Sequence, residues 1–162
     1  MITLINNMST TLYNQDRTYR NNRIRIAVDL LLNDYNFFST QQSYDNSDNF
    51  YVYDESNGVY LLDAEMFIVD RLNELFPNSF QHYSHIRSVI NQIQHWSPIV
   101  PIDQINPKGI TNYINGLYFH NENTLKPHNP TIFTTKQFPY NFITESKLLI
   151  SESRLQALNY ID

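Results

Sequence analysis

The chain has no cysteine and only 3 glycines among its 162 residues. Without cysteine it forms no disulfide, carries no thiol nucleophile and offers no thiolate ligand to a zinc ion. The glycines, Gly58, Gly109 and Gly116, are too few and too widely spaced for the glycine-rich loops that hold nucleotide phosphates. The composition therefore excludes thiol chemistry and the two common phosphate-binding loops.

Long apolar runs are also missing. No run approaches the roughly 18 residues that a membrane-spanning helix needs, and the first residues lack the basic region and apolar stretch of a secretory signal. We therefore expect a soluble cytoplasmic protein with no membrane partner. The residues present are 41% hydrophobic and 14% aromatic, which is too apolar for a disordered chain.

The spacing of the apolar residues predicts an α+β fold. Helical spacing alternates with short β-prone runs, and Asn57-Gly58 supplies the positive φ of a tight hairpin turn. The expected elements are a helix at 22–35, a hairpin at 50–62, helices at 63–76 and 84–96, β segments between 110 and 142, and a last helix at 145–160. This order indicates a single compact domain with helices packed on short antiparallel hairpins.

The net charge of −5 is unevenly distributed along the chain. Residues 29–74 hold ten acids and one arginine, whereas the segment before them is basic and interleaves arginine with tyrosine. Such a segment can hold phosphates and stack bases, or it can be solvated or neutralised by the acidic residues. The pI near 5.4 differs from that of most domains dedicated to DNA binding. The candidate nucleic-acid-binding residues are Arg17, Tyr19, Arg20, Arg23 and Arg25.

Acid pairs that could hold catalytic metal ions are scarce. The closest are Asp54 with Glu55, in an expected turn, and Asp63 with Glu65, at an expected helix start. Asp63 fits a helix cap better than a metal ligand, because acids favour the first turn of a helix. No serine or lysine has a base partner at a readable spacing. We therefore expect no catalytic residue, which argues against an enzyme.

The histidines fit structural roles better than a metal site. His82 and His85 could share a helix face, but a site needs three or four ligands and no acid lies close to them in sequence. His128 lies between Pro127 and Pro130, and its ring can hydrogen-bond backbone carbonyls that the prolines leave unpaired. We expect no metal and no cofactor.

Three segments together form a recognisable block: Asn115 to Leu117, Leu125 to Pro130 and Thr134 to Phe142. The block resembles the end of the domain that lies N-terminal to superfamily-3 helicase motors in phage and plasmid primases and in the poxvirus primase-helicase. The hairpin around Asn57-Gly58 is similar to the one that this domain carries further upstream. The resemblance spans roughly residues 25–142.

The resemblance implies a non-catalytic connector, or collar, that links a primase to a ring-shaped ATPase. Asn115 and Gly116 would form a tight turn, and the strand ends would be fixed by Pro127, His128, Pro130, Pro139 and Tyr140. It also implies three parts: a basic N-terminal arm at 1–21, a connector-like domain at 22–144 and a C-terminal helix at 145–162. No motor follows the block, so we expect either a free-standing form or an excised piece.

The leading hypothesis is a DNA replication accessory protein of a phage, pathogenicity island or other bacterial mobile element. It would dock on a replicative helicase or primase, through the acidic segment 29–74 or the apolar side of the last helix. The alternative is a module that binds single-stranded DNA or RNA through the basic arm. A third hypothesis is a primase whose active site cannot be recognised. Self-association is a further expectation, because the similar proteins work as rings.

Overall fold

The computed structural model describes residues 2–40, 49–77, 80 and 82–143, with side chains of the first helix described from Thr18 onward. The chain divides into two compact units. Unit 1 comprises residues up to 53 together with 60–102, and unit 2 comprises 54–59 together with the residues from 103. The helix predicted at 145–160 lies outside the described residues.

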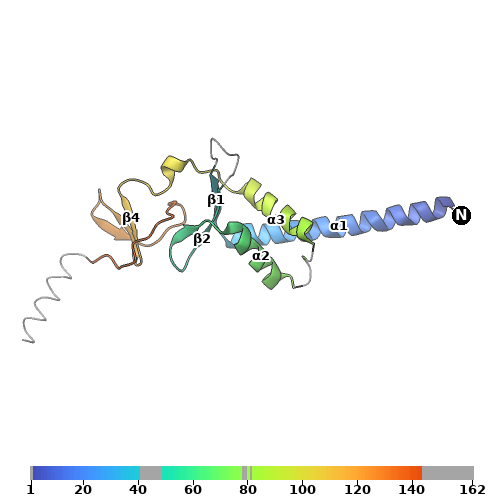
Figure 1. The fold of residues 1–162 in the computed structure, drawn as a ribbon, viewed down its shortest axis with the longest axis horizontal. Coiled ribbons are helices and arrows are strands. Elements are labelled where there is room, and N and C mark those ends of the chain that lie inside the picture. Colours follow the sequence, from blue (N-terminus) through green and yellow to red (C-terminus); the bar gives the residue numbers. More distant parts are fainter. Residues whose placement is uncertain (1, 41–48, 78–79, 81, 144–162) are drawn as a thin grey trace, which may run out of the picture. The chain divides into compact units, whose positions relative to one another are not determined.

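Unit 1 contains three helices and a three-stranded antiparallel sheet. Its elements are α1 (Ile2–Asp34), β1 (Phe37–Thr40), β2 (Asn49–Asp54), β3 (Val59–Leu61), α2 (Ala64–Leu75) and α3 (Tyr83–Trp96). The strand order is β1-β2-β3, and α3 packs on both α1 and α2 (Figure 1). The helices α2 and α3 begin and end within one residue of their predicted limits.

Helix α1 begins at Ile2, about twenty residues before the predicted start at 22. Residues 1–34 contain neither glycine nor proline, so no residue in this segment interrupts a helix. The predicted start at 22 followed the apolar spacing from Ile24, which is the first buried residue among the described side chains of α1. The basic arm predicted to precede the helix is therefore part of it.

The core of unit 1 is formed where the three helices meet the sheet. Leu31 of α1, Ile68 and Leu72 of α2, and Val89 and Ile93 of α3 are completely buried. Burial of each such side chain stabilises the fold by about 1.5–3 kcal/mol. All four residues of β1 are also buried, since β1 pairs with β2 on one edge and Pro98–Val100 approaches its other edge.

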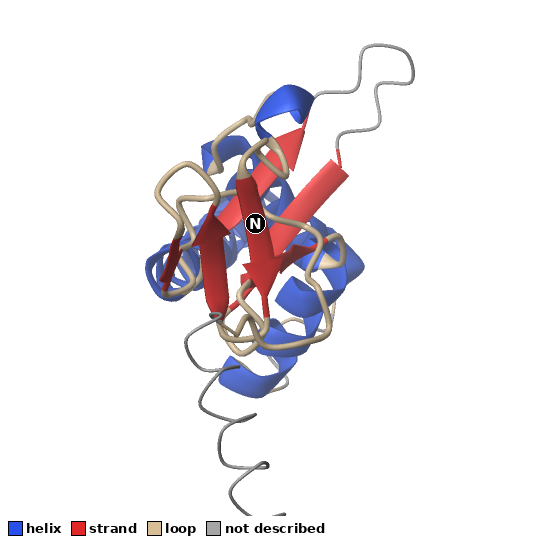
Figure 2. Cartoon of the chain, turned by 90° about the vertical axis from the view of Figure 1, so that its left-hand side faces the viewer, coloured by secondary structure: helices blue, strands red, loops and turns tan. Residues whose placement is uncertain are grey.

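Unit 2 is built on a second antiparallel sheet, with strand order β4-β5-β6 (Figure 2). The strands are β4 (Ile110–Tyr113), β5 (Gly116–Phe119) and β6 (Thr124–Lys126), preceded by the short 3-10 helix η1 (Ile102–Gln104). Tyr113 pairs with Gly116, so Ile114 and Asn115 form the turn between β4 and β5. Helices and antiparallel hairpins together confirm the predicted α+β class. None of the described helices is both long and apolar enough to cross a membrane.

Candidate functional site

The segment that follows β6 runs back along the free edge of β4. Phe138 N donates to Asn112 O at 2.8 Å, and Ile114 N donates to Tyr140 O at 3.2 Å. Tyr113 and Phe138 form a parallel bridge. Segments that lie far apart in the sequence therefore meet at β4 within unit 2.

Asn112 lies at the centre of this meeting point, where its side chain is 3% exposed. Its Nδ2 donates to Gly58 O and to Thr134 Oγ1, both at 2.8 Å. Its Oδ1 accepts a hydrogen bond from His128 Nε2 at 3.1 Å. A buried amide with all of these partners is satisfied, whereas loss of the amide would leave several buried polar groups unpaired.

The ring of His128 hydrogen-bonds to Asn112 and to its neighbour in β4. Its Nε2 also donates to Tyr113 O at 2.8 Å, and since both partners are acceptors, the ring carries its hydrogen on Nε2. The ring therefore bonds a backbone carbonyl, and that carbonyl belongs to Tyr113 of β4, not to a residue beside the two prolines. The ring lies against Gly58, where φ is +68° and an added Cβ would overlap the ring atoms. Glycine is therefore required at this turn both by its conformation and by the histidine.

Gln137 completes the arrangement. Its Nε2 donates to Asn57 O and also lies 3.3 Å from Tyr113 O and 3.4 Å from Asn112 Oδ1. We call the five residues Gly58, Asn112, His128, Thr134 and Gln137 the Asn112 network. It joins the turn at 54–59 to β4 and to the segment after β6, all within unit 2.

The turn at 54–59 is itself ordered by the carboxylate of Asp54. Its Oδ1 accepts from Ser56 N at 3.0 Å and Ser56 Oγ at 2.6 Å, and its Oδ2 accepts from Asn57 Nδ2 at 2.6 Å. Partial burial acts to raise the pKa of Asp54, but the hydrogen bonds from Ser56 and Asn57 outweigh it and hold the pKa below its ordinary value. The carboxylate thus serves the turn.

The other residues of the resemblance have separate positions. The Asn115 side chain brackets Phe142, accepting from its N at 2.8 Å and donating to its O at 3.0 Å. Gly116 opens β5 with φ +143°, and an added Cβ would overlap the carbonyl of Lys126. Pro127 begins the segment after β6, Pro130 lies in the turn that follows His128, and Pro139 and Tyr140 line a groove described next.

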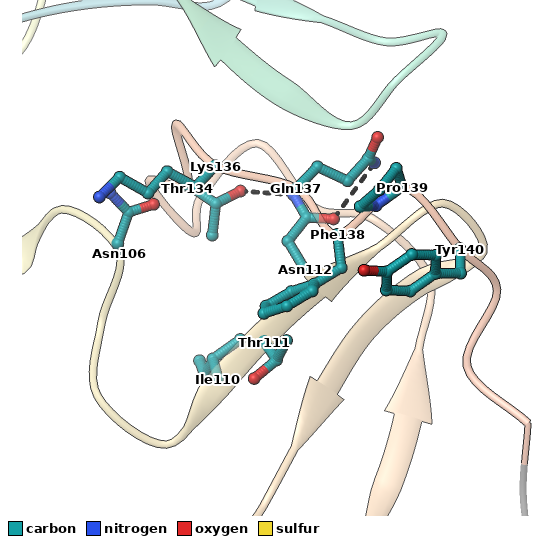
Figure 3. Close-up of a pocket in the computed structure, with 10 residues that line it drawn as sticks. All are labelled: Asn106, Ile110, Thr111, Asn112, Thr134, Lys136, Gln137, Phe138, Pro139 and Tyr140. Carbon is teal, nitrogen blue, oxygen red and sulfur yellow. Dashed lines mark hydrogen bonds between the residues drawn. The ribbon is translucent and has the colours of Figure 1, made fainter.

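This groove has a volume of about 630 Å³ and lies along the β4 edge (Figure 3). Its lining residues are Asn106, Ile110, Thr111, Asn112, Thr134, Lys136, Gln137, Phe138, Pro139 and Tyr140. The side chains of Phe138 and Tyr140 are 51% and 60% exposed, and Lys136 is the one charged residue among those that line the groove.

The predicted nucleic-acid-binding residues are distributed around α1. Tyr19 is exposed and Arg23 lies over its ring at 4.8 Å, while Arg20 is exposed on the same side. Arg25 points about 160° away from Arg23, because successive residues of a helix turn by about 100°, and it pairs with Asp29 at 3.8 Å. The side chain of Arg17 lies outside the described residues. The helix thus gathers Tyr19, Arg20 and Arg23 and separates Arg25 from them.

The acids and histidines that were weighed as possible metal ligands make ordinary structural contacts. Asp63 occupies the predicted N-cap position of α2, although its side chain makes no capping hydrogen bond. Glu65 pairs with Arg87 at 2.9 Å. The rings of His82 and His85 contact each other edge to face at the start of α3. Within the described ranges, no three His, Asp or Glu side chains come together as a metal site.

The Asn112 network contains residues that the sequence alone did not single out. Gln137 belongs to one of the recognised segments and Asn112 lies just before another, yet neither was expected to be important. The sequence signal for Asn112 was an asparagine inside a β-prone run, where this residue type is uncommon. A comparison with protein-family models finds no match for the chain. A comparison with curated proteins finds no similar sequence.

Proposed function

We propose that the chain is a non-catalytic accessory protein of DNA replication that docks on a replicative helicase or primase. The observation that carries this proposal is the Asn112 network. In the region that resembles the connector domain, polar side chains form hydrogen bonds within the protein. His128 bonds Tyr113 O, and Asn112 bonds Gly58 O. Polar groups satisfied in this way support a scaffold and leave no reactive pair for catalysis.

A surface of unit 1 has the composition expected of a docking site. Leu62 and Met66, at the start of α2, are 56% and 64% exposed. Asp63 and Asp70 flank them and make no ion pair with any described residue. Exposed apolar side chains with a polar rim are typical of protein-protein interfaces. We call Leu62, Asp63, Met66 and Asp70 the α2 surface, and it lies within the acidic segment that the sequence pointed to.

A superfamily-3 helicase encoded beside the gene for this chain is the expected partner. The two purified proteins should co-elute in size-exclusion chromatography at micromolar concentration. Combined Leu62→Ser and Met66→Ser substitutions should weaken the complex roughly tenfold or more, because buried interface anchors each contribute about 1–2 kcal/mol or more.

The matched control is Tyr83→Ser on α3, where the tyrosine is 74% exposed and lies outside the α2 surface. This variant should bind as well as the unaltered protein. Failure to form any complex with the helicase or with the primase would reject the docking function. Equal losses from both variants would reject the α2 surface as the place of docking.

A second candidate function, binding of single-stranded nucleic acid, is favoured by the cluster on α1. Tyr19, Arg20 and Arg23 share one side of the helix and can contact phosphates and a base together. Combined Arg20→Ala and Arg23→Ala should weaken binding to a single strand. They should also lower the slope of log K against log[salt] by about 0.7 for each phosphate that the protein no longer neutralises.

Arg25→Ala is the control for this experiment, since it removes the same charge from another side of α1. It should change the affinity less than either Arg20→Ala or Arg23→Ala. Binding that is independent of salt would contradict the role of the arginines, and so would equal effects of all three substitutions.

A further inference from the structure

The groove along β4 is lined by the segment 136–140, which bends at Pro139 and Tyr140. Within this segment the side chain of Gln137 turns inward to Asn57 O and Tyr113 O. Lys136, Phe138 and Tyr140 stand at every second position and line the groove (Figure 3). The groove therefore presents an ammonium group followed by two aromatic rings.

Contacts within unit 2 hold the rings of Phe138 and Tyr140 in place. Phe138 stacks on Tyr113 with ring centroids 5.6 Å apart and an interplanar angle of 28°, and its centroid lies 6.2 Å from that of Tyr140. Backbone hydrogen bonds fix the segment on either side of Pro139, because Phe138 N donates to Asn112 O and Ile114 N donates to Tyr140 O. Such rings lose little conformational entropy when a ligand covers them.

The polar groups of the groove wall are mostly engaged within the protein. Asn106 exchanges two hydrogen bonds of 2.9 Å with Thr135, and Thr111 Oγ1 bonds His120 Nε2 at 2.8 Å. Asn112 and Gln137 are engaged in the Asn112 network. What remains for a ligand is two ring faces, the ammonium of Lys136 and the hydroxyl of Tyr140.

We propose that this groove binds single-stranded nucleic acid, with bases stacked on Phe138 and Tyr140 and a phosphate on Lys136. A ligand that uses flat aromatic faces and one cation, in a groove lined by no acid, is planar and negatively charged. Strand addition by a peptide to β4 is blocked, because the backbone at Phe138 and Tyr140 already bonds that edge. This site is independent of docking on a helicase and distinct from the cluster on α1.

Fluorescence anisotropy with a labelled oligothymidylate of roughly 12 nucleotides, within the usual range of site sizes, tests the proposal on the full chain. Phe138→Ala and Tyr140→Ala should each weaken binding by about 5- to 100-fold, the range measured for loss of one base-aromatic stack. Tyr140→Phe keeps the ring and should retain most of the affinity. Phe138→Leu keeps apolar volume without an aromatic face, so it should weaken binding even if Phe138→Ala does not fold.

Lys136→Gln should weaken binding and lower the salt slope by about 0.7. Lys126→Gln is its matched control, since it makes the same charge change on β6, where Lys126 pairs with Glu122 at 2.7 Å. The proposal is overturned if the oligonucleotide does not bind, or if the aromatic variants bind as tightly as the unaltered protein. Competition by thymidine monophosphate as strong as by the oligonucleotide would assign the groove to a free nucleotide instead, and competition by a proline-rich peptide alone would assign it to a protein.

Discussion

Gly58→Ala should lower the free energy of unfolding by about 2–5 kcal/mol. Gly58 has φ +68°, a left-handed conformation that costs a residue with a Cβ about 1–2 kcal/mol. The new Cβ would also overlap the ring of His128. That ring can move only by giving up its hydrogen bonds to Tyr113 O and Asn112 Oδ1, and overpacking of this kind costs about 1–3 kcal/mol.

Urea unfolding followed by circular dichroism measures this loss, and the chain offers a matched control. Gly109 also has positive φ, at +85°, but an added Cβ there meets no atom within 4 Å. Gly109→Ala should therefore cost only the conformational part, about 1–2 kcal/mol. In a His128→Ala background, where the ring is already absent, Gly58→Ala should cost only the conformational part. Equal losses for Gly58→Ala and Gly109→Ala would show that the contact with His128 does not constrain the turn.

Asn112→Leu should destabilise the protein by about 2–4 kcal/mol. Leucine has the same number and branching of side-chain heavy atoms, so the substitution leaves little cavity and removes mainly hydrogen bonds. The carbonyl of Gly58 and the hydroxyl of Thr134 would lose their shared donor in a buried site. Each buried polar group left unsatisfied costs about 1–3 kcal/mol.

Asn115→Leu makes the same chemical change at an exposed side chain, whose two hydrogen bonds join it to Phe142. Water can replace these bonds, so the expected loss is about 1 kcal/mol or less. The midpoint of urea unfolding compares the two variants directly. A loss at Asn112 no larger than that at Asn115 would be inconsistent with a buried network that organises unit 2.

Much of the secondary structure could be predicted because its causes are local. The turn at Asn57-Gly58 follows from the positive φ that glycine adopts readily, and Pro77 and Pro98 lie just past the ends of α2 and α3. The start of α1 was predicted too late, because the prediction followed hydrophobic spacing, which was read only from Ile24, the first buried residue among the described side chains of α1.

The candidate sites were predicted less completely. His128 was expected to bond a backbone carbonyl, and it does, but its partner Tyr113 could not be identified from spacing. Phe138 was read as part of a recognised segment, and its exposure beside Lys136 and Tyr140 depends on the pairing of that segment with β4. Tyr19 and Arg25 were grouped by sequence proximity, whereas the helix turns them to different sides.

The sequence by itself determined the α+β class, the limits of α2 and α3, the Asn57-Gly58 turn, and the absence of cysteine chemistry and of common phosphate-binding loops. These properties follow from residue types and short-range periodicity. Only the tertiary structure decided that Asn112 meets Gly58, 54 residues away, and that Lys136, Phe138 and Tyr140 line one groove. An amide can hydrogen-bond with many partners, and an aromatic ring can pack against many partners. The folding of distant segments against β4 decides which partners these side chains have.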